Sequence, residues 1–170
     1  MARTRKAQTS GLRLRGFYRV NIVEQDGRIV GDSGWLENKV VNEGVLKYLI
    51  DPLRTGTGVQ LSRMALGTGT TPAATATSLN GEITDGGTAS RITVVVGTAS
   101  GSTAVSYAAT WLSASGFVTA SKTIQNIMII SNTTSGGTMF AGNTFASSVL
   151  NVNQDRTNTR WPSVDVPLAA

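Results

Sequence analysis

The sequence predicts a mainly β fold, a β-sandwich or jelly-roll-like domain with about eight strands and one short helix. Gly, Ser and Thr are abundant and only 15% of the residues are charged, a composition typical of strands and turns. Short runs of alternating apolar and polar residues recur at intervals of about ten residues. The length of 170 residues with 40% hydrophobic content fits one packed domain.

The N-terminal segment is strongly basic. Residues 1–19 hold six basic and no acidic residues, which leaves nine basic against ten acidic residues for the remainder. We divide the chain into a basic arm, residues 1–16, and a single β-rich domain, residues 17–170. A short cationic segment gains order when a partner neutralises it, and otherwise remains a solvated tail. The arm residues that are candidates for electrostatic docking are Arg3, Arg5, Lys6, Arg13 and Arg15.

A β-hairpin is predicted directly after the arm. Residues 17–24 place Tyr18, Val20 and Ile22 on one side, and a return strand follows the dipeptide Asp26-Gly27. Asp-Gly between two β-rich runs indicates a tight turn, because both central residues of a type I′ turn need a positive φ.

Residues 42–51 are predicted to form the helix. Asn42 is the candidate N-cap, Glu43 complements the positive end of the helix, and Pro52 ends it. Apolar residues repeat at a four-residue spacing, so we expect this apolar stripe to be buried and the helix to close one end of the sandwich. The repeating pairs are Val45 with Leu49 and Leu46 with Ile50.

The remaining predicted strands are residues 61–66, 88–97, 102–112, 123–131, 138–145 and 160–168. Residues 123–131 are apolar on both faces after Asn126, which indicates a central strand covered on both sides or lying at an interface. Trp111 follows the inward alternation of its strand, so we expect it in the core.

The residue inventory argues against enzyme classes. The chain contains no Cys and no His, which excludes thiol nucleophiles, Ser-His-Asp triads, disulfides and most zinc or haem ligation. The ten acidic residues show neither the D-x-D nor the E-x-x-E spacing of a metal cage. We therefore predict that the protein is not an enzyme and that it holds no cofactor and no metal.

Two local sequences resemble catalytic motifs. Asp32-Ser33-Gly34 matches the active-site sequence of aspartic proteases, but that chemistry takes two carboxylates and the chain has one copy, so a homodimer would be required. Asp32, Glu82 and Asp85 are the acids considered for a carbohydrate-acting enzyme, the last of the alternatives, and nothing places two of them at catalytic separation.

The stretch MALGTGTTP, residues 64–72, looks like a phosphate-binding turn. A dinucleotide fingerprint needs a third glycine where Pro72 stands, and a P-loop needs Gly-Lys-Ser/Thr, which is absent. We expect instead a strand with a Thr/Gly-rich exit whose backbone visits positive φ. The sequence also lacks an apolar run of about eighteen residues and a hydrophobic signal core, which predicts synthesis in the cytoplasm and no membrane contact.

A series of short sequence motifs runs along about residues 40–166. They are Asn42-Glu43-Gly44 with Leu46 and Leu49, residues 64–72 with Leu79 and Glu82-Ile83, residues 127–132, residues 136–141, and Thr144-Phe145. In this order they resemble a pattern in small structural proteins of tailed bacteriophages. The resemblance implies a β-rich virion component, such as a capsid decoration or cement protein, a head fibre, or an adaptor or fibre of the tail. Pro162 interrupts the final strand expected in that group, which predicts an edge strand there.

The basic arm, the neutral body and the resemblance lead to one expected function. We expect a decoration protein that binds the outer capsid and stabilises capsomer junctions, with the major capsid protein or other virion proteins as partners. A homo-oligomer is expected, with a trimer favoured. Phe17 and Trp35 are candidate apolar anchors beside the arm.

Three alternatives remain open. The first is a tail or neck adaptor or fibre-anchoring component of the virion. The second is a non-specific nucleic-acid-binding module, although no aromatic residue precedes Phe17 as a platform for base stacking. The third is carbohydrate binding by exposed Trp or Tyr.

Overall fold

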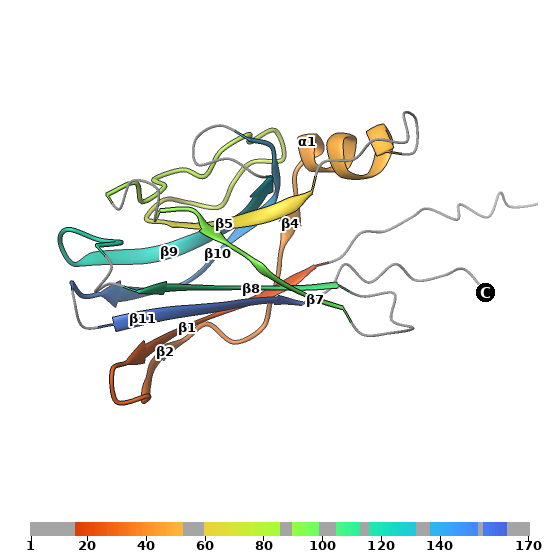
Figure 1. The fold of residues 1–170 in the computed structure, drawn as a ribbon. Coiled ribbons are helices and arrows are strands. Elements are labelled where there is room, and N and C mark those ends of the chain that lie inside the picture. Colours follow the sequence, from red (N-terminus) through yellow and green to blue (C-terminus); the bar gives the residue numbers. More distant parts are fainter. Residues whose placement is uncertain are drawn as a thin grey trace, which may run out of the picture.

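The computed structural model describes residues 16–52, 60–85, 90–98, 105–112, 116–131, 137–152 and 155–162. Two sheets form two layers, and strands account for 53% of the structure (Figure 1). This confirms the predicted mainly β fold with one short helix, and the described part of the chain holds eleven strands.

The six-stranded sheet is the lower layer in Figure 1. Its strand order is β2-β1-β11-β8-β7, and β3 pairs with the start of β1. All of its neighbouring strands are antiparallel. The strands are β1 (Phe17–Glu24), β2 (Ile29–Asp32), β3 (Leu36–Glu37), β7 (Val95–Thr98), β8 (Val105–Leu112) and β11 (Asp155–Pro162).

The five-stranded sheet forms the other layer, in the order β4-β10-β9-β5-β6. The strands are β4 (Lys39–Val40), β5 (Leu61–Gly67), β6 (Ile92–Thr93), β9 (Lys122–Ser131) and β10 (Met139–Leu150). The main core lies between the two sheets, because one buried cluster joins Tyr18 and Trp111 of the first sheet to Met64, Ile124 and Phe145 of the second. The prediction that Trp111 is a core residue is confirmed.

The predicted hairpin is present as β1 and β2, but its turn differs from the expected one. The N–H of Gly27 donates to the carbonyl of Glu24 at 3.0 Å, and Gly27 has a φ of 90°. The loop therefore contains residues 25–27, with the left-handed glycine last, as in three-residue hairpin loops. The inward residues are Tyr18, Val20 and Ile22, as predicted.

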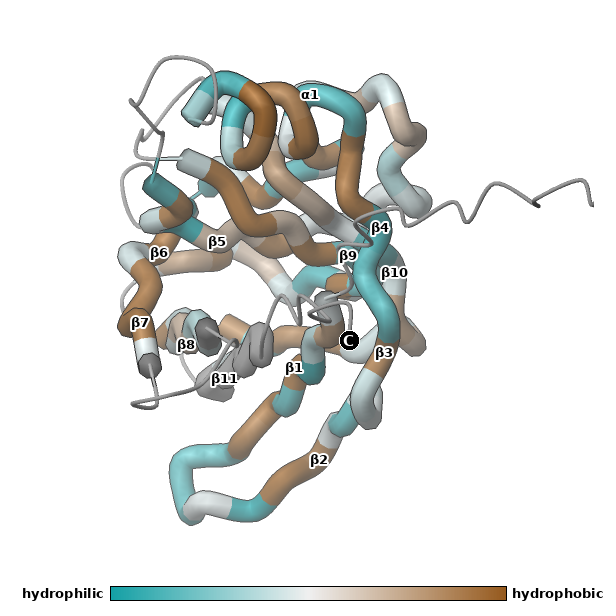
Figure 2. Tube along the Cα trace, turned by 90° about the vertical axis from the view of Figure 1, so that its right-hand side faces the viewer, coloured by the Kyte–Doolittle hydropathy of each residue, from teal (hydrophilic) through white to brown (hydrophobic). Residues whose placement is uncertain are grey.

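Residues 88–97 were expected to form one strand and instead contribute to both sheets. β6 pairs with β5, whereas β7 pairs with β8, and Val94 lies between them. Val94 is buried and its N–H donates to the carbonyl of Ser62 at 2.9 Å. The chain thus crosses between the layers at Val94, and Figure 2 shows this hydrophobic segment running down one side. Residues 88 and 89 lie outside the described residues.

The prediction for β9 is confirmed, since its apolar residues are buried on both faces of the sheet. Ile127 and Ile129 belong to the core between the sheets, and Met128 and Ile130 belong to a second cluster on the other face. Leu79, from the segment that follows β5, is part of this second cluster. The chain itself therefore covers both faces of β9.

The expected edge position of the last strand is wrong. β11 lies between β1 and β8 and pairs with both along its length. It begins at Asp155, in a polar stretch without apolar alternation, where Thr157 is nevertheless fully buried. Pro162 is its last residue, so its missing N–H falls at the end of the ladder, where the loss is tolerated. Residues 163–168 lie outside the described residues.

The predicted helix is present as α1 (Asn42–Val45), which continues as a wider turn, η1 (Leu46–Ile50). Glu43 lies in the first turn, as predicted. The expected cap is wrong, because Val41 occupies the N-cap position and no side chain caps this end. The N–H of Asn42 instead donates to the carbonyl of Ala74 at 2.8 Å.

The expected burial of the helix stripe is wrong for Leu46 and Ile50, which are exposed, whereas Val45 and Leu49 are half-buried. Contacts with β10 hold the helix instead. A Cβ on Gly44 would lie 2.2 Å from the carbonyl oxygen of Phe140, so only glycine allows this close approach. The ring of Tyr48 meets the ring of Phe140 edge-on, with the centroids 5.2 Å apart.

Residues 64–72 form the end of β5 and its exit, as predicted, but the glycines serve a different purpose. Neither Gly67 nor Gly69 has a positive φ. A Cβ on Gly67 would lie 2.4 Å from Oδ1 of Asn126, and one on Gly69 would lie 2.3 Å from the carbonyl oxygen of Asn80. The amide of Asn126 also donates to that carbonyl at 2.8 Å. The glycines therefore allow two chain segments to pack closely together.

Candidate interaction surface

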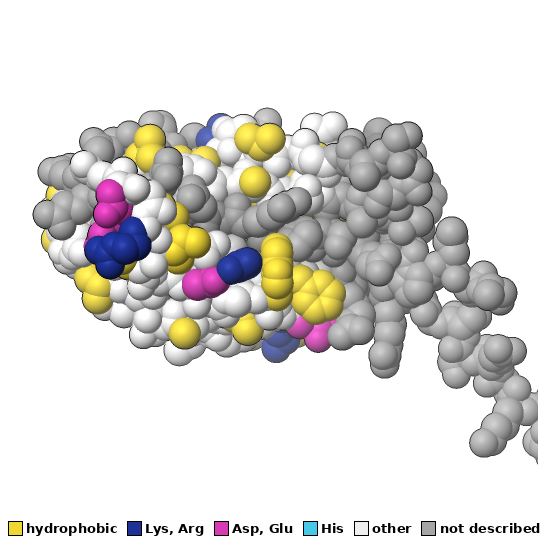
Figure 3. All heavy atoms as spheres, turned by 90° about the horizontal axis from the view of Figure 1, so that it is seen from below, with side chains coloured by type: hydrophobic (Ala, Val, Ile, Leu, Met, Phe, Trp, Pro, Cys, Tyr) yellow, Lys and Arg dark blue, Asp and Glu magenta, His cyan; other side chains and the backbone are white. Residues whose placement is uncertain are grey.

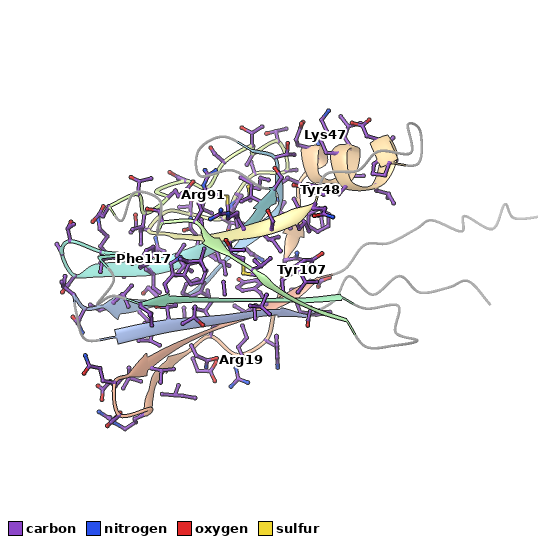
Figure 4. All side chains as sticks on the ribbon, in the orientation of Figure 1. Arg19, Lys47, Tyr48, Arg91, Tyr107 and Phe117 are labelled. Atoms are coloured by element: carbon purple, nitrogen blue, oxygen red, sulfur yellow. The ribbon has the colours of Figure 1, made fainter. Side chains whose placement is uncertain are left out.

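Four residues gather on the outer face of the six-stranded sheet, next to the point where the arm joins β1. We call Phe17, Arg19, Asp32 and Trp35 the arm-root patch. Tyr18 points into the core, so by strand alternation Phe17 and Arg19 point outward. Figure 4 shows Arg19 on the outside of this layer, and Figure 3 shows hydrophobic side chains beside adjacent basic and acidic ones on this face.

Arg19 organises the patch. Its Nε donates to Oδ1 of Asp32 at 2.9 Å, and its Nη2 donates to Oδ2, so the pair is bidentate. The guanidinium carbon of Arg19 also lies 5.9 Å from the ring centroid of Trp35, within the range of a cation–π contact. The carboxylate of Asp32 thus holds Arg19 against an indole that remains 49% exposed.

The Asp32-Ser33-Gly34 turn has a structural explanation. Oγ of Ser33 accepts the N–H of Val20 at 2.9 Å, which ties the turn to β1. Hydrogen bonds from the Arg19 guanidinium and then from the Gly34 N–H lower the pKa of Asp32 to about 2. The turn therefore presents an ionised carboxylate that positions Arg19.

The depressed pKa of Asp32 predicts a specific pH dependence. Because the folded pKa of about 2 lies below the ordinary aspartate value of 3.8, the ion pair stabilises the fold above about pH 4 and this contribution is lost as the pH falls towards 2. A carbon-detected NMR titration should place the Asp32 midpoint near 2. The loss of unfolding free energy between pH 4 and pH 2 should be smaller in Asp32→Asn. A midpoint near 4 would contradict the bidentate pair.

The structure places Arg19 between the two anchors named from the sequence, in contact with Trp35 and on the same side of β1 as Phe17, and it adds Arg19 and Asp32 to the patch. Trp35 contacts Arg19, and half-buried Phe17 lies two residues before Arg19 on the same side of β1. Arg19 and Asp32 were not predicted to belong to this patch. Arg19 was counted with the basic segment, and Asp32 was considered only as a protease carboxylate. The alternation that buries Tyr18 was the available signal for Arg19. The arm residues Arg3, Arg5, Lys6, Arg13 and Arg15 lie outside the described residues.

The other acids considered for catalysis are also engaged by cations. Glu82 forms a bidentate pair with Arg91, with distances of 2.5 and 2.8 Å. Asp85 accepts hydrogen bonds from Thr119 and lies 3.0 Å from Nζ of Lys122, and the hydrogen bond with Lys122 lowers the pKa of Asp85. These carboxylates act as structural ties between segments.

Within the described ranges, no group of three or more His, Cys, Asp or Glu side chains is arranged to hold a metal ion. No helix in those ranges is long and apolar enough to cross a membrane. Comparisons of the chain with protein-family models, with curated proteins and with solved structures find no match.

Proposed function

We propose that this chain is a structural protein of a tailed-bacteriophage virion, and that it decorates the outer capsid and stabilises capsomer junctions. The observation that carries the proposal is the arm-root patch. A half-exposed tryptophan with an arginine held against its ring combines two of the residue types that dominate binding hot spots. The sequence resemblance supplies the virion as the place where this binding surface acts.

The arm and the patch are suited to bind the same partner. The arm ends at residue 16, immediately before β1, so the chain itself joins the arm's basic residues to the patch. Two linked contacts act at a high effective concentration and bind more tightly than either contact alone. Asp32 already balances the charge of Arg19, so the patch supplies apolar and cation–π contact while the arm supplies electrostatic attraction.

Binding of purified protein to capsids that lack it tests the proposal. We expect Trp35→Ala to weaken binding by about tenfold or more, the loss typical of a hot-spot residue. Deletion of residues 2–15 should weaken binding and reduce its dependence on salt, because the arm's charges are screened by ions. Ile50→Ala is the matched control, since Ile50 is 45% exposed but lies on the helix of the other layer.

The outcomes separate the alternatives. Unchanged binding by both the Trp35 variant and the deletion would remove the patch and the arm from the mechanism. Salt-dependent retention of free DNA that is lost with the arm would favour the nucleic-acid module. A few copies per particle, measured by densitometry against the major capsid protein, would favour a tail or neck component over a decoration protein.

A further inference from the structure

The exposed edges of the two sheets differ in how they are protected. Natural sheets protect free edges with short strands, charged residues and bulges, because unpaired backbone groups invite pairing with another chain. At the edges of the five-stranded sheet, β4 and β6 have two residues each, and β4 carries Lys39. At one edge of the six-stranded sheet, β2 ends in Asp32 and its pairing with β1 is bulged, and β3 has two residues. Each of these edge strands is therefore short, charged or bulged.

The strand at the other edge of the six-stranded sheet, β7, has neither a charged residue nor a bulge in its pairing with β8. It has four residues, Val95-Val96-Gly97-Thr98, with no charge and no proline. Among the described strands its only neighbour is β8, with Val95 opposite Ala108 and Val96 opposite Tyr107. Val95 is 72% exposed and Val96 is 52% exposed. Adjacent strand residues point to opposite faces, so both faces of this edge are open and apolar.

We propose that two copies of this chain pair through their β7 strands, antiparallel and about a two-fold axis, so that the two six-stranded sheets become continuous. A two-fold axis brings the residues close to it near their own copies, so a charged residue there would meet a like charge. The sequence contains no charged residue from Ile92 to Ser121, a stretch that includes both β7 and β8. This edge is therefore suited to its own copy.

Strand direction also favours the two-fold arrangement. Every neighbouring pair in the sheet is antiparallel, so β2 and β7 run in the same direction. With the core faces of both sheets on the same side, joining β7 of one copy to β2 of the next would give a parallel pair between otherwise antiparallel sheets. Pairing β7 with β7 keeps the antiparallel pattern, which is the more stable one per residue. The expected trimer rested on the family resemblance, whereas the edge strand favours a dimer contact.

The dimer would leave the arm-root patch accessible, because β2 and β3 lie at the opposite edge of the sheet. Each dimer would then present two patches, so a partner that contacts both would bind more tightly through avidity. The pairing does not depend on what that partner is.

A charge placed on the edge tests the pairing. We expect the wild-type chain to dimerise reversibly in analytical ultracentrifugation, and Val95→Lys to weaken the dimer by about tenfold or more. Val149→Lys is the matched control, because Val149 is 55% exposed on β10, a strand of the other sheet. Circular dichroism melts show whether both variants fold equally well. A wild-type chain that is monomeric up to about 1 mM, or a dimer that resists Val95→Lys, would overturn the proposal.

Cysteine cross-linking tests the two-fold symmetry separately, since the chain has no native cysteine. Opposite residues of an antiparallel pair have Cα atoms about 4.5–5.5 Å apart, within the range that a disulfide spans. We expect Val95→Cys or Val96→Cys to form disulfide-linked dimers on mild oxidation, and Val149→Cys to remain uncross-linked. Association that yields no cross-link from a cysteine at any position of β7, tested alone and in mixtures of two single-cysteine variants, would overturn the antiparallel two-fold pairing.

Discussion

Glu82→Ala is expected to lower the free energy of unfolding by about 3–5 kcal/mol, because it leaves the buried guanidinium of Arg91 without its carboxylate. The side chains of Glu82 and Arg91 are only 12% and 8% exposed. Glu82 forms a β-bridge with Gly67, the last residue of β5, and Arg91 directly precedes β6. The ion pair therefore ties these two segments together. Urea denaturation, followed by circular dichroism, measures the loss.

Three further variants separate the buried charge from simple side-chain loss. Glu82→Gln keeps an acceptor oxygen but removes the charge, so its cost should be intermediate. The double variant Glu82→Met with Arg91→Met should recover most of the stability, since apolar side chains often replace a buried ion pair without loss. Lys47→Ala breaks the half-buried pair with Asp51, at 3.1 Å, which is more exposed than the Glu82–Arg91 pair, and should cost less than about 1 kcal/mol. An equal cost for Glu82→Ala and Lys47→Ala would contradict the argument.

Elements defined by local patterns were predicted well. The alternation around Tyr18, the Asp26-Gly27 turn signal and the double-faced apolar run of β9 each depend on neighbouring residues, and each appears where expected. The details that failed depend on distant contacts. Asn42 is the first helical residue, with Val41 at the N-cap, and the carbonyl of Ala74, far along the chain, accepts its N–H.

Sheet membership was less predictable than strand position. Ile92, Val94 and Val96 alternate as one strand would, yet the chain bends at Val94 and its two halves pair in different sheets. Periodicity reports which side is apolar and does not report which partner strand lies alongside. The last strand was expected at residues 160–168 and at an edge. Instead β11 begins at Asp155 and is held by pairing on both sides, which no local pattern shows.

The arm-root patch was only half predictable for the same reason. Phe17 and Trp35 were noticed as aromatic residues close to the arm. The pair of Arg19 with Asp32 forms because the hairpin register sets Asn21 opposite Asp32, which brings the neighbouring Arg19 within reach. A register is a property of the folded hairpin, so the sequence alone did not assign the salt bridge.

Trp111→Ala is expected to lower the free energy of unfolding by about 3–5 kcal/mol, the range for deleting a buried tryptophan. For a chain of this size the melting temperature should fall by roughly 6–20 °C. Trp111 is fully buried, its ring lies 6.0 Å from that of Phe117, and its Nε1 donates to the carbonyl of Ser90 at 3.2 Å. Trp111→Phe keeps most of the packing and loses the hydrogen bond, so its cost should be smaller.

The same substitution at Trp35 should weaken binding and leave the stability almost unchanged. Trp35→Ala removes a side chain that is 49% exposed, so the free energy of unfolding should change by no more than about 1 kcal/mol while binding to the partner falls. Thermal melts and binding measured on both alanine variants therefore distinguish a core tryptophan from a binding tryptophan. If Trp35→Ala lowered the melting temperature as much as Trp111→Ala, its loss of binding would follow from unfolding, and Trp35 would have to be reassigned to the core.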